Sequence, residues 1–283
     1  MKNLMIPALA LFLSAAAQAD DSPLWMRYCA ISPDGQTIAF SYQGDIYTVP
    51  SSGGKARQLT THPAHDTRPV WSPDGQRIAF ASNRSGNFDV FLMNKEGGEP
   101  KRLTTHSTNE YPTTFKDNGH ILYLANVLQD AKDIQFPGTR FMQVYEISTD
   151  GGRPDLYSSL YMENIALSKD GSKLLYNDYK GYEDPWRKHH QSSITRDIWL
   201  CTLGKDRSFQ KVTTFGGEDR NPVWAADGAS FYYLSEEKGS FNIFKKDLAG
   251  NNEKQITTHT THPCVSLPPI IPGLYAIVTT ARS

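Results

Sequence analysis

Short runs of apolar residues, many of them β-branched or aromatic, recur along the chain and alternate with clusters of Gly, Asp, Asn and Pro. One such run is Arg77-Ile78-Ala79-Phe80-Ala81, and Asp89-Val90-Phe91-Leu92-Met93 follows it after a gap rich in turn residues. Runs of this length, divided by turn residues, predict consecutive antiparallel strands. Because no segment keeps a sustained apolar period of 3.6 residues, the pattern predicts an all-β fold.

The runs belong to an internal repeat, whose clearest copy spans residues 68–106. This copy begins with Arg-Pro-Val-Trp-Ser-Pro-Asp-Gly and ends with Leu-Thr-Thr-His. The turn glycines of five copies are spaced by 40, 44, 52 and 57 residues, and they are Gly35, Gly75, Gly119, Gly171 and Gly228. One four-stranded sheet cannot bury both of its faces alone, so copies of this length predict the radially stacked blades of a β-propeller.

The length of the chain gives the expected number of blades. At about 44 residues per copy, the 264 residues after position 19 make six blades, of which five are clear and the sixth is incomplete or degenerate. We therefore predict a propeller of six four-stranded antiparallel blades, with a five-bladed or seven-bladed ring as the alternative. The expected blade ranges are about 25–63, 64–107, 108–160, 161–217, 218–260 and 261–283.

The first nineteen residues have the pattern of an export signal. Lys2 precedes the apolar run 4–17, which is short for a membrane span, and Ala17-Gln18-Ala19 has the small residues that a signal peptidase accepts. We expect residues 1–19 to be a signal peptide and residues 20–283 to be exported, to the periplasm or another extracytoplasmic place, with no membrane span. A disordered or buried N-terminal helix is the alternative.

Composition limits which partners the chain can bind, but it does not indicate an activity. The chain has 29 Lys and Arg against 30 Asp and Glu, a formal net charge of −1, and therefore no large field of one sign that would favour nucleic acid. The three cysteines, Cys29, Cys201 and Cys264, are an odd number without CxxC spacing, so they predict neither a disulfide framework nor a zinc site.

The repeated pieces resemble the propeller repeats of TolB-like and tricorn-like proteins, which are related to Trp-Asp repeats. The match covers residues 25–259, and the segment from Lys180-Gly181-Tyr182 to Thr195-Arg196-Asp197-Ile198-Trp199 is similar to the fourth blade of the N-terminal propeller of exported tricorn-like serine peptidases. In that family the catalytic serine and histidine lie in a later domain. The resemblance implies that this propeller recognises or gates peptides and packs on other domains.

Candidate catalytic and metal-binding residues have structural explanations. The chain has no Gly-x-Ser-x-Gly elbow or other local catalytic signature, so we expect no catalytic residue in it. The recurrence of His62, His106 and His259 after Thr-Thr pairs predicts turn residues, and we expect neither a metal nor a cofactor. Other recurring residues are expected to hold turns or to pack between blades, and these are Asp34, Asp45, Asp74, Asp89, Asp170, Asp197, Asp227, Trp71 and Trp224.

The two places where the repeat is interrupted are the expected recognition elements. Residues 126–141 and 179–196 are inserted between the second and third strands of the third and fourth copies, on one face of the propeller. Aromatic residues interleaved with arginine are typical of binding hot spots, and long loops on a rigid scaffold often carry recognition. The candidate residues for binding a peptide or a partner domain are Tyr182, Trp186, Arg187, Lys188, His189, His190 and Arg196.

The repeat stops after His262, where Pro268, Pro269 and Pro272 replace a strand pattern. One interpretation is a degenerate closing blade. The other is a frameshift after about residue 263, because a shifted frame over residues 275–283 can encode a segment like 39–46 of the first copy. We therefore expect an exported, non-catalytic propeller of a tricorn-like serine peptidase. The alternatives are a stand-alone TolB-like interaction propeller and the propeller of a prolyl-oligopeptidase-type enzyme.

Overall fold

A computed structural model describes residues 26–126, 142–181, 191–249 and 251–260, together with two short strands at 264–266 and 277–278. The described residues form five four-stranded antiparallel sheets, in which each strand pairs with the next along the chain. The first three sheets comprise β1 Arg27–Ile31, β2 Thr37–Tyr42, β3 Asp45–Pro50, β4 Arg57–Gln58; β5 Asp66–Trp71, β6 Arg77–Ser82, β7 Asp89–Asn94, β8 Gly97–Arg102; and β9 Glu110–Asp117, β10 His120–Asn126, β11 Met142–Ser148, β12 Asp155–Ser158. The last two comprise β13 Met162–Leu167, β14 Lys173–Asp178, β15 Ile198–Thr202, β16 Ser208–Lys211; and β17 Asp219–Trp224, β18 Ser230–Ser235, β19 Asn242–Asp247, β20 Lys254–Gln255.

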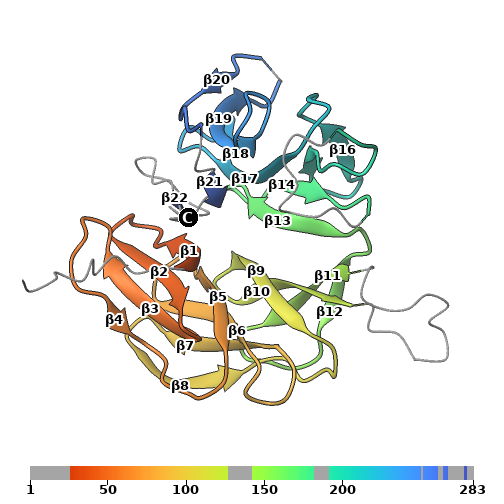
Figure 1. Cartoon of the computed structure of the whole chain (residues 1–283). Coiled ribbons are helices and arrows are strands. Elements are labelled where there is room, and N and C mark those ends of the chain that lie inside the picture. Colours follow the sequence, from red (N-terminus) through yellow and green to blue (C-terminus); the bar gives the residue numbers. More distant parts are fainter. Residues whose placement is uncertain are drawn as a thin grey trace, which may run out of the picture.

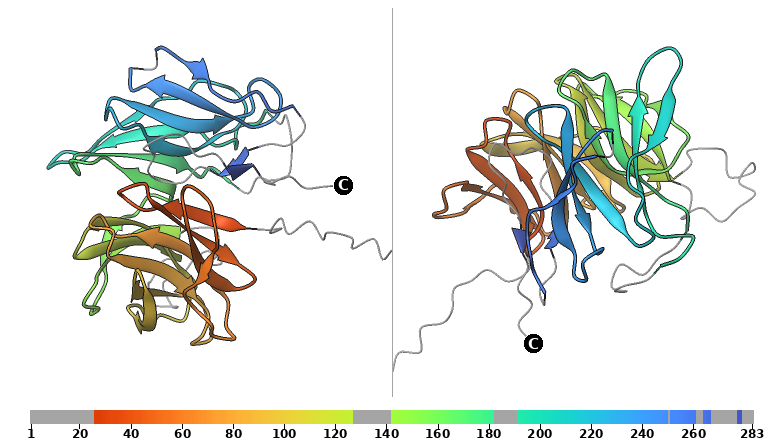
Figure 2. Two further views of the ribbon diagram at one scale, coloured as in Figure 1. Left: turned by 90° about the vertical axis from the view of Figure 1, so that its left-hand side faces the viewer. Right: turned by 90° about the horizontal axis from the view of Figure 1, so that it is seen from above.

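The sheets are arranged radially as the blades of a propeller (Figure 1). The first strand of each blade contacts the first strand of the next, in the order β1, β5, β9, β13 and β17, and these strands face the centre. A two-stranded sheet of β21 Cys264–Ser266 and β22 Ile277–Val278 lies between the first and fifth blades in all three views (Figures 1 and 2). The prediction of an all-β propeller is confirmed.

The predicted number of six blades is wrong, because the propeller has five four-stranded blades. The prediction divided the 264 residues after position 19 by an average copy of about 44 residues, and it counted the tail 261–283 as an incomplete sixth blade. The long connections from β10 to β11 and from β14 to β15 instead enlarge the third and fourth blades. In addition, the sequence after β20 carries three prolines within residues 268–272, and proline cannot donate the backbone hydrogen bond that a strand ladder needs. Only the two short strands β21 and β22 are described there.

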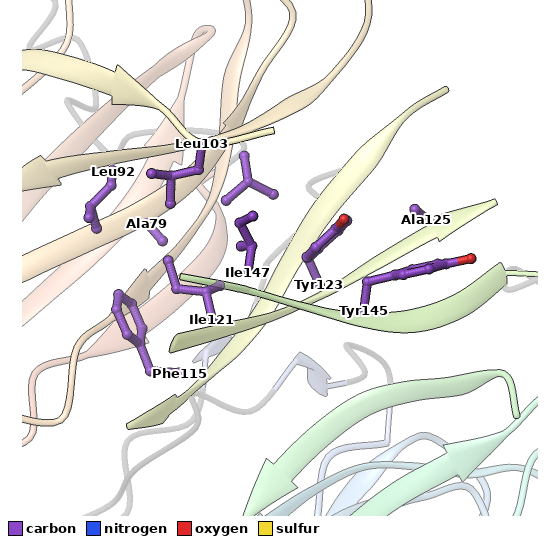
Figure 3. Packing of buried hydrophobic residues seen from close by; sticks show 10 residues of the cluster. Ala79, Leu92, Leu103, Phe115, Ile121, Tyr123, Ala125, Tyr145 and Ile147 are labelled. Carbon is purple, nitrogen blue, oxygen red and sulfur yellow. The ribbon is translucent and has the colours of Figure 1, made fainter. Parts of the chain in front are cut away.

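Apolar side chains fill the spaces between neighbouring blades. Between the second and third blades, side chains from both sheets interdigitate in one buried cluster, of which Figure 3 labels Ala79, Leu92, Leu103, Phe115, Ile121, Tyr123, Ala125, Tyr145 and Ile147. Two tryptophans add a directed contact, since Trp71 Nε1 donates to the carbonyl of Ala30 at 3.1 Å and Trp224 Nε1 donates to that of Ala166 at 2.9 Å. Both bonds join a first strand to the preceding blade, as predicted for these residues.

The recurring aspartates of the hairpin turns have the structural role predicted for them. Asp34 Oδ1 accepts from the Ser32 hydroxyl at 2.5 Å and from the backbone N–H of Gln36 at 3.0 Å, and Asp74 and Asp170 repeat this geometry. Asp227 accepts from the backbone N–H of Ala229 in the same way, but its hydroxyl partner is Ser230. These hydrogen bonds favour the charged carboxylate, so they lower the pKa of Asp170 to about 2. The turns therefore close each hairpin between the first and second strands.

The acids at the start of the third strands bond mainly to side chains rather than to turn backbone. Asp45 Oδ1 accepts from the hydroxyl of Thr60 at 3.0 Å, and Thr60 Oγ1 accepts in turn from the N–H of Ile46 at 3.0 Å. Asp89 pairs with Arg102 at 2.8 Å, and Asp197 pairs with Lys211 at 2.8 Å. These contacts explain why Asp and Leu-Thr-Thr recur together, because the threonine fastens the fourth strand to the third.

Candidate functional site

The first strands share a backbone irregularity near one face of the propeller. In four blades one residue of this strand has a positive φ, at +52° for Tyr28, +54° for Arg68, +51° for Asn164 and +55° for Asn221. At each of these residues the pairing with the second strand shifts register, as in a β-bulge. Asparagine tolerates this conformation, whereas tyrosine and arginine rarely adopt it.

In the fourth and fifth blades the bulges are joined by an amide network. Asn164 Nδ2 donates to Asn177 Oδ1 and to Asn221 Oδ1, each at 3.2 Å. The N–H of Asn221 donates to Asn177 Oδ1 at 2.8 Å, and Asn177 Nδ2 donates to the carbonyl of Asp219 at 2.9 Å. The side chains on this half of the rim, which the fourth and fifth blades form, are therefore hydrogen-bonded to one another, and we call it the bonded half.

Ion pairs continue the bonded arrangement beside the amides. Arg196 Nε lies 2.8 Å from Glu163 Oε2, and Arg196 Nη1 lies 3.0 Å from Glu218 Oε1. Arg220 Nη1 is 3.6 Å from the same Glu218 oxygen, and its guanidinium lies 4.1 Å from the centroid of the Phe241 ring. The two carboxylates raise the pKa of Arg196 against the opposing effect of its burial. Arg196, one of the predicted binding residues, thus joins β13 of the fourth blade to Glu218, the residue directly before β17 of the fifth.

The first three blades instead surround a hollow of about 430 Å³, which we call the rim pocket. The first blade supplies Arg27 and Tyr28 from β1, and Ser41 and Tyr42 from β2. The turn Gln43-Gly44 completes this wall, with φ of +50° and +93°, which suit a two-residue hairpin. This turn joins β2 to β3, the connection that is long in the third and fourth blades.

Aromatic and cationic side chains from the second and third blades complete the rim pocket. The guanidinium of Arg68 lies 4.4 Å from the ring centroid of Tyr111 and 5.1 Å from that of Tyr28. The ring centroid of Phe88 lies 5.4 Å from that of Tyr111, and His65 meets Phe88 edge to face at 6.0 Å, so five side chains form one continuous series of contacts. Burial raises the pKa of the Tyr111 hydroxyl, and the nearby Arg68 opposes that shift.

Backbone hydrogen bonds between blades hold the walls of the rim pocket. The N–H of Asp66 donates to the carbonyl of Gly44 at 2.7 Å, and the N–H of Glu110 donates to that of Phe88 at 2.7 Å. The N–H of Phe88 also donates to Asn109 Oδ1 at 3.1 Å. Each turn that lines the pocket is thus tied to the first strand of the next blade.

Acidic residues begin three of the first strands, and their surroundings differ. Asp66 accepts from Arg84 Nη2 at 3.1 and 2.9 Å. Among the described residues no arginine pairs with Glu110 or Asp219, and burial raises the pKa of each to about 7. For Glu110 the hydroxyl of Thr104 opposes this shift and the charge of Asp89 adds to it.

Most of the predicted binding residues lie outside the described residues. These are Tyr182, Trp186, Arg187, Lys188, His189 and His190. The described part of the chain contains no group of three or more His, Cys, Asp or Glu that could hold a metal ion. His62 and His106 accept backbone N–H groups two residues further on, at 3.0 and 3.3 Å, which fits the predicted turn role.

Sequence reasoning missed the rim pocket because it looked for residues that recur or that interrupt the repeat. Arg68 and Tyr28 occupy one repeat position, where the fourth and fifth copies have asparagine. A bulky residue at a position that elsewhere carries asparagine was the available signal. The neighbouring contact with Tyr111 comes from a third blade and needs the three-dimensional structure.

Comparison with known proteins places the fold in a family. A model of the tricorn protease N-terminal β-propeller domain matches residues 23–268. The chain belongs to this family. A tricorn protease homolog from Saccharolobus solfataricus is 22% identical over 247 residues, which are 84% of this chain and 22% of that protein. This tricorn-type propeller therefore spans about a fifth of the length of that relative.

Solved structures share the fold. The crystal structure of the tricorn protease superimposes with a TM-score of 0.66 and 20% identity, and covers 85% of this chain and 23% of that one. TolB from Acinetobacter baumannii gives a TM-score of 0.60 and 17% identity, and covers 83% of this chain and 55% of that one. Within the described residues, no helix of this tricorn-type propeller is long and apolar enough to cross a membrane.

Proposed function

We propose that this tricorn-type propeller is a non-catalytic recognition unit of an exported serine peptidase, and that it binds extended peptides at the rim pocket. The observation that carries the proposal is the guanidinium of Arg68 between the rings of Tyr28 and Tyr111, at the wall of an open hollow. Arginine and aromatic side chains dominate binding hot spots, because they combine large apolar area with directed polar contacts. Tyr28 keeps 44% of its surface exposed.

Backbone strain at the same place supports the proposal. A residue other than glycine or asparagine with positive φ costs about 1–3 kcal/mol, and such strain concentrates at functional sites. Tyr28 and Arg68 both carry this cost, whereas the equivalent positions of the fourth and fifth blades carry asparagine. We therefore infer that Tyr28 and Arg68 are kept in this disfavoured conformation because their side chains bind the peptide.

Peptide titration tests the proposal. Fluorescence anisotropy would follow an unstructured, fluorescein-labelled peptide added to the chain, in parallel with Arg68→Ala and Tyr111→Ala. We expect saturable binding by the parent chain and a loss of about tenfold or more in each variant, since a hot-spot truncation costs about 2 kcal/mol. The same peptide should remain uncleaved.

Arg207→Ala is the matched control for this titration. The guanidinium of Arg207 also lies over a tyrosine ring, at 4.9 Å from the ring centroid of Tyr157, and Arg207 donates to the Tyr157 carbonyl at 3.0 Å. This pair lies away from the rim pocket, with Tyr157 in the outer strand β12 and Arg207 directly before the outer strand β16. Removal of the Arg207 side chain should leave peptide binding unchanged. Binding that survives Arg68→Ala and Tyr111→Ala would refute the rim pocket as the site.

The inserted segment of the fourth blade is a further part of the proposed binding face. It joins β14 to β15, the same type of connection that Gln43-Gly44 makes in the first blade beside the rim pocket. Alanine at Trp186, Arg187 and Lys188 together should weaken binding of the peptide or of a partner domain of the parent peptidase. Unchanged binding would remove this segment from the proposal.

Export is proposed from residues 1–19. Expression of the whole chain in a Gram-negative host, followed by fractionation and N-terminal sequencing, should give a periplasmic protein that begins at Asp20. A chain that keeps Met1 in the cytoplasm would contradict export, and it would leave the peptide-binding proposal intact.

A stand-alone TolB-like interaction module is the second candidate, favoured by the fold shared with TolB. The coding DNA beyond the last codon separates the two. A reading frame that continues into a PDZ-like segment supports the peptidase parent, and an immediate stop supports the TolB-like module. A nucleophile elbow there would support the prolyl-oligopeptidase type instead.

A further inference from the structure

A second hollow, of about 500 Å³, lies between the first and second blades. The rim pocket borders the turn that follows β2, whereas this hollow borders the hairpin turn that precedes β2 and the equivalent turn before β6. Because the two ends of a strand reach opposite faces of the propeller, the two hollows are separate. We call the second one the hairpin pocket, and the residues that line it include Asp34, Arg57, Trp71, Asp74, Lys95 and Glu96.

Trp71 gives the hairpin pocket an apolar wall. Its indole is partly exposed, and its one polar atom, Nε1, already donates to the carbonyl of Ala30. The part of the indole that borders the pocket therefore offers carbon atoms to a ligand. A volume of about 500 Å³ lies in the range of pockets that hold small molecules.

The fifth blade has an equivalent tryptophan with a different neighbour. Trp224 bonds to a carbonyl of the preceding blade as Trp71 does, and Trp224 and Leu248 pack against the same buried cluster. Leu248 directly follows the third strand of its blade, and the residue in that place after β7 is Lys95, whose side chain is 40% exposed. The second blade thus has a charged, accessible side chain where the fifth blade has an apolar one.

Two carboxylates on the hairpin turns offer hydrogen-bond acceptors within reach of a ligand. The two turns lie against each other, since a β-carbon on Gly75 would be 3.5 Å from Cδ of Pro33. Asp34 and Asp74 are exposed, and within the described residues only Oδ1 of each accepts hydrogen bonds, all from its own turn. These hydrogen bonds lower the pKa of both carboxyl groups, so both are ionised at neutral pH with Oδ2 available.

Cationic side chains on the same rim offer donors. Arg57 uses Nη2 to donate to the carbonyl of Glu96 at 2.6 Å, and its guanidinium has further N–H groups. Lys95 lies 3.8 Å from the exposed carboxylate of Glu96. The lining therefore contains three carboxylates and two cations, and neither sign dominates. The ligand that fits this rim both donates and accepts hydrogen bonds.

We propose that the hairpin pocket binds a pyranose sugar, with the Trp71 indole against the carbon-bound hydrogens of the ring and the carboxylates of Asp34 and Asp74 accepting from its hydroxyls. Each sugar hydroxyl donates one hydrogen bond and accepts others, so it can use both the acids and the cations of the rim. The carbon-bound hydrogens give the same molecule an apolar surface that suits an aromatic wall. A simple cation or anion would use only one half of these groups. The inference goes beyond peptide binding at the rim pocket and does not depend on it.

Saturation-transfer difference NMR tests the proposal with the full chain. The probes are glucose, N-acetylglucosamine, cellotriose and chitotriose, and we expect saturable binding with the strongest transfer to carbon-bound ring protons. Binding of a monosaccharide shows that one ring suffices, and binding of the trimers alone identifies a glycan chain. Spermidine is the comparison ligand. Binding of spermidine and of no sugar would overturn the proposal, because the carboxylates would then serve as an amine site.

Lys95→Leu gives the second blade the residue that the fifth blade has. We expect the leucine to pack beside Trp71 and occupy part of the pocket, so sugar binding should fall below detection while stability in urea stays equal or rises. Asp74→Asn keeps an oxygen for the turn and removes the charge. Hydrogen bonds to charged groups are stronger than those to neutral groups, so we expect binding to weaken about tenfold.

Lys245→Ala is the matched control. Lys245 also lies beside a hairpin aspartate, 3.2 Å from Asp227, but in the fifth blade. Its removal should leave sugar binding unchanged. Sugar binding that survives both Lys95→Leu and Asp74→Asn would overturn the assignment to the hairpin pocket.

The outcomes also separate this inference from the proposed function. Arg68→Ala and Tyr111→Ala should weaken peptide binding and leave sugar binding intact, whereas Lys95→Leu should do the reverse. A sugar signal that is lost in Arg68→Ala would place the sugar in the rim pocket and overturn this inference. Failure of every sugar to bind a parent chain that circular dichroism shows to be folded would overturn it as well, without affecting peptide recognition.

Discussion

The two halves of the propeller rim start from the same backbone bulge and use it differently. In the fourth and fifth blades the bulge residues are asparagines, which accept positive φ and bond to each other through Asn177. In the first and second blades they are Tyr28 and Arg68, which disfavour this conformation and face a hollow. Where the bulge residue tolerates positive φ, its side-chain hydrogen bonds stabilise the ring. Where the bulge residue disfavours positive φ, we infer that its side chain binds a ligand.

The strongest test of this contrast removes the shared carboxylate of the bonded half. Glu218→Ala leaves Arg196 and Arg220 without that partner in a region where Glu218 is only 7% exposed. Loss of one partner from a buried ion pair costs about 3–5 kcal/mol, so we expect a fall of this size in the free energy of unfolding. Urea denaturation measures it.

The matched control for Glu218→Ala is Glu96→Ala. Glu96 lies 3.8 Å from Lys95 and keeps 61% of its side chain exposed. Exposed pairs contribute about 0–1 kcal/mol, so this variant should unfold close to the parent. Equal effects of the two substitutions would show that the bonded half does not stabilise the ring.

The second prediction concerns pH and the acids that begin the first strands. Burial raises the pKa of Glu110 to about 7, whereas an unfolded glutamate titrates near 4.5. Between these values the folded chain holds more protons than the unfolded chain, so this group makes stability fall as pH rises from about 4.5 to about 7. The linkage is at most about 1.4 kcal/mol per pH unit for one proton.

Urea midpoints at pH 5 and pH 7.5 measure this effect, with Glu110→Gln as the comparison. The glutamine variant should lose less stability than the parent over this interval, because it has no proton to release. Asp219→Asn should act in the same direction, since the pKa of Asp219 is also raised to about 7. A parent and a Glu110→Gln variant with the same pH dependence would contradict the raised pKa.

A smaller effect is expected from the bulge of the bonded half. Asn221→Ala places at φ of +55° a residue that tolerates the left-handed conformation less well than asparagine, and it removes the oxygen that accepts from Asn164. A left-handed conformation costs about 1–2 kcal/mol for such a residue, so the free energy of unfolding should fall by about that amount. Asn221→Gly is the control, because glycine accepts the conformation and should recover part of the loss.

The smallest effect should have the opposite sign in the rim pocket. Arg68→Asn replaces a strained residue by one that accepts positive φ, so we expect stability to stay equal or to rise by up to about 1 kcal/mol. Peptide binding should nevertheless fall as in Arg68→Ala. If Arg68→Asn destabilises the chain as Asn221→Ala does, the two halves of the rim do not differ in the way described.

Local sequence features predicted the blades well and their number badly. The Asp-Gly turns and the Asp with Leu-Thr-Thr pieces are held by hydrogen bonds within one blade, so each copy reveals them in its own sequence. The count failed because it divided the chain by an average copy length, which the connections from β10 to β11 and from β14 to β15 exceed, and because it took the proline-containing tail after β20 for a sixth blade.

The rim pocket could not be predicted from the sequence, for a different reason. Its stack combines Tyr28, Arg68 and Tyr111, one from each of three blades, with about 40 residues between successive members. Periodicity places them on neighbouring first strands, but it does not report the bulge that turns Tyr28 and Arg68 toward the hollow. The predicted binding residues were chosen from the inserted loop, and the one described among them, Arg196, is bonded to Glu163 and Glu218.

The tryptophan bonds between blades bear on how such a ring can grow by gene duplication. Trp71 and Trp224 carry the donor within their own repeat, and each acceptor is a backbone carbonyl of the preceding blade, at Ala30 and Ala166. Every residue has a backbone carbonyl, so a newly duplicated blade that contains the tryptophan can form this hydrogen bond without a matching mutation in its neighbour. Blade number can therefore change among descendants while the junctions that carry the tryptophan keep their chemistry.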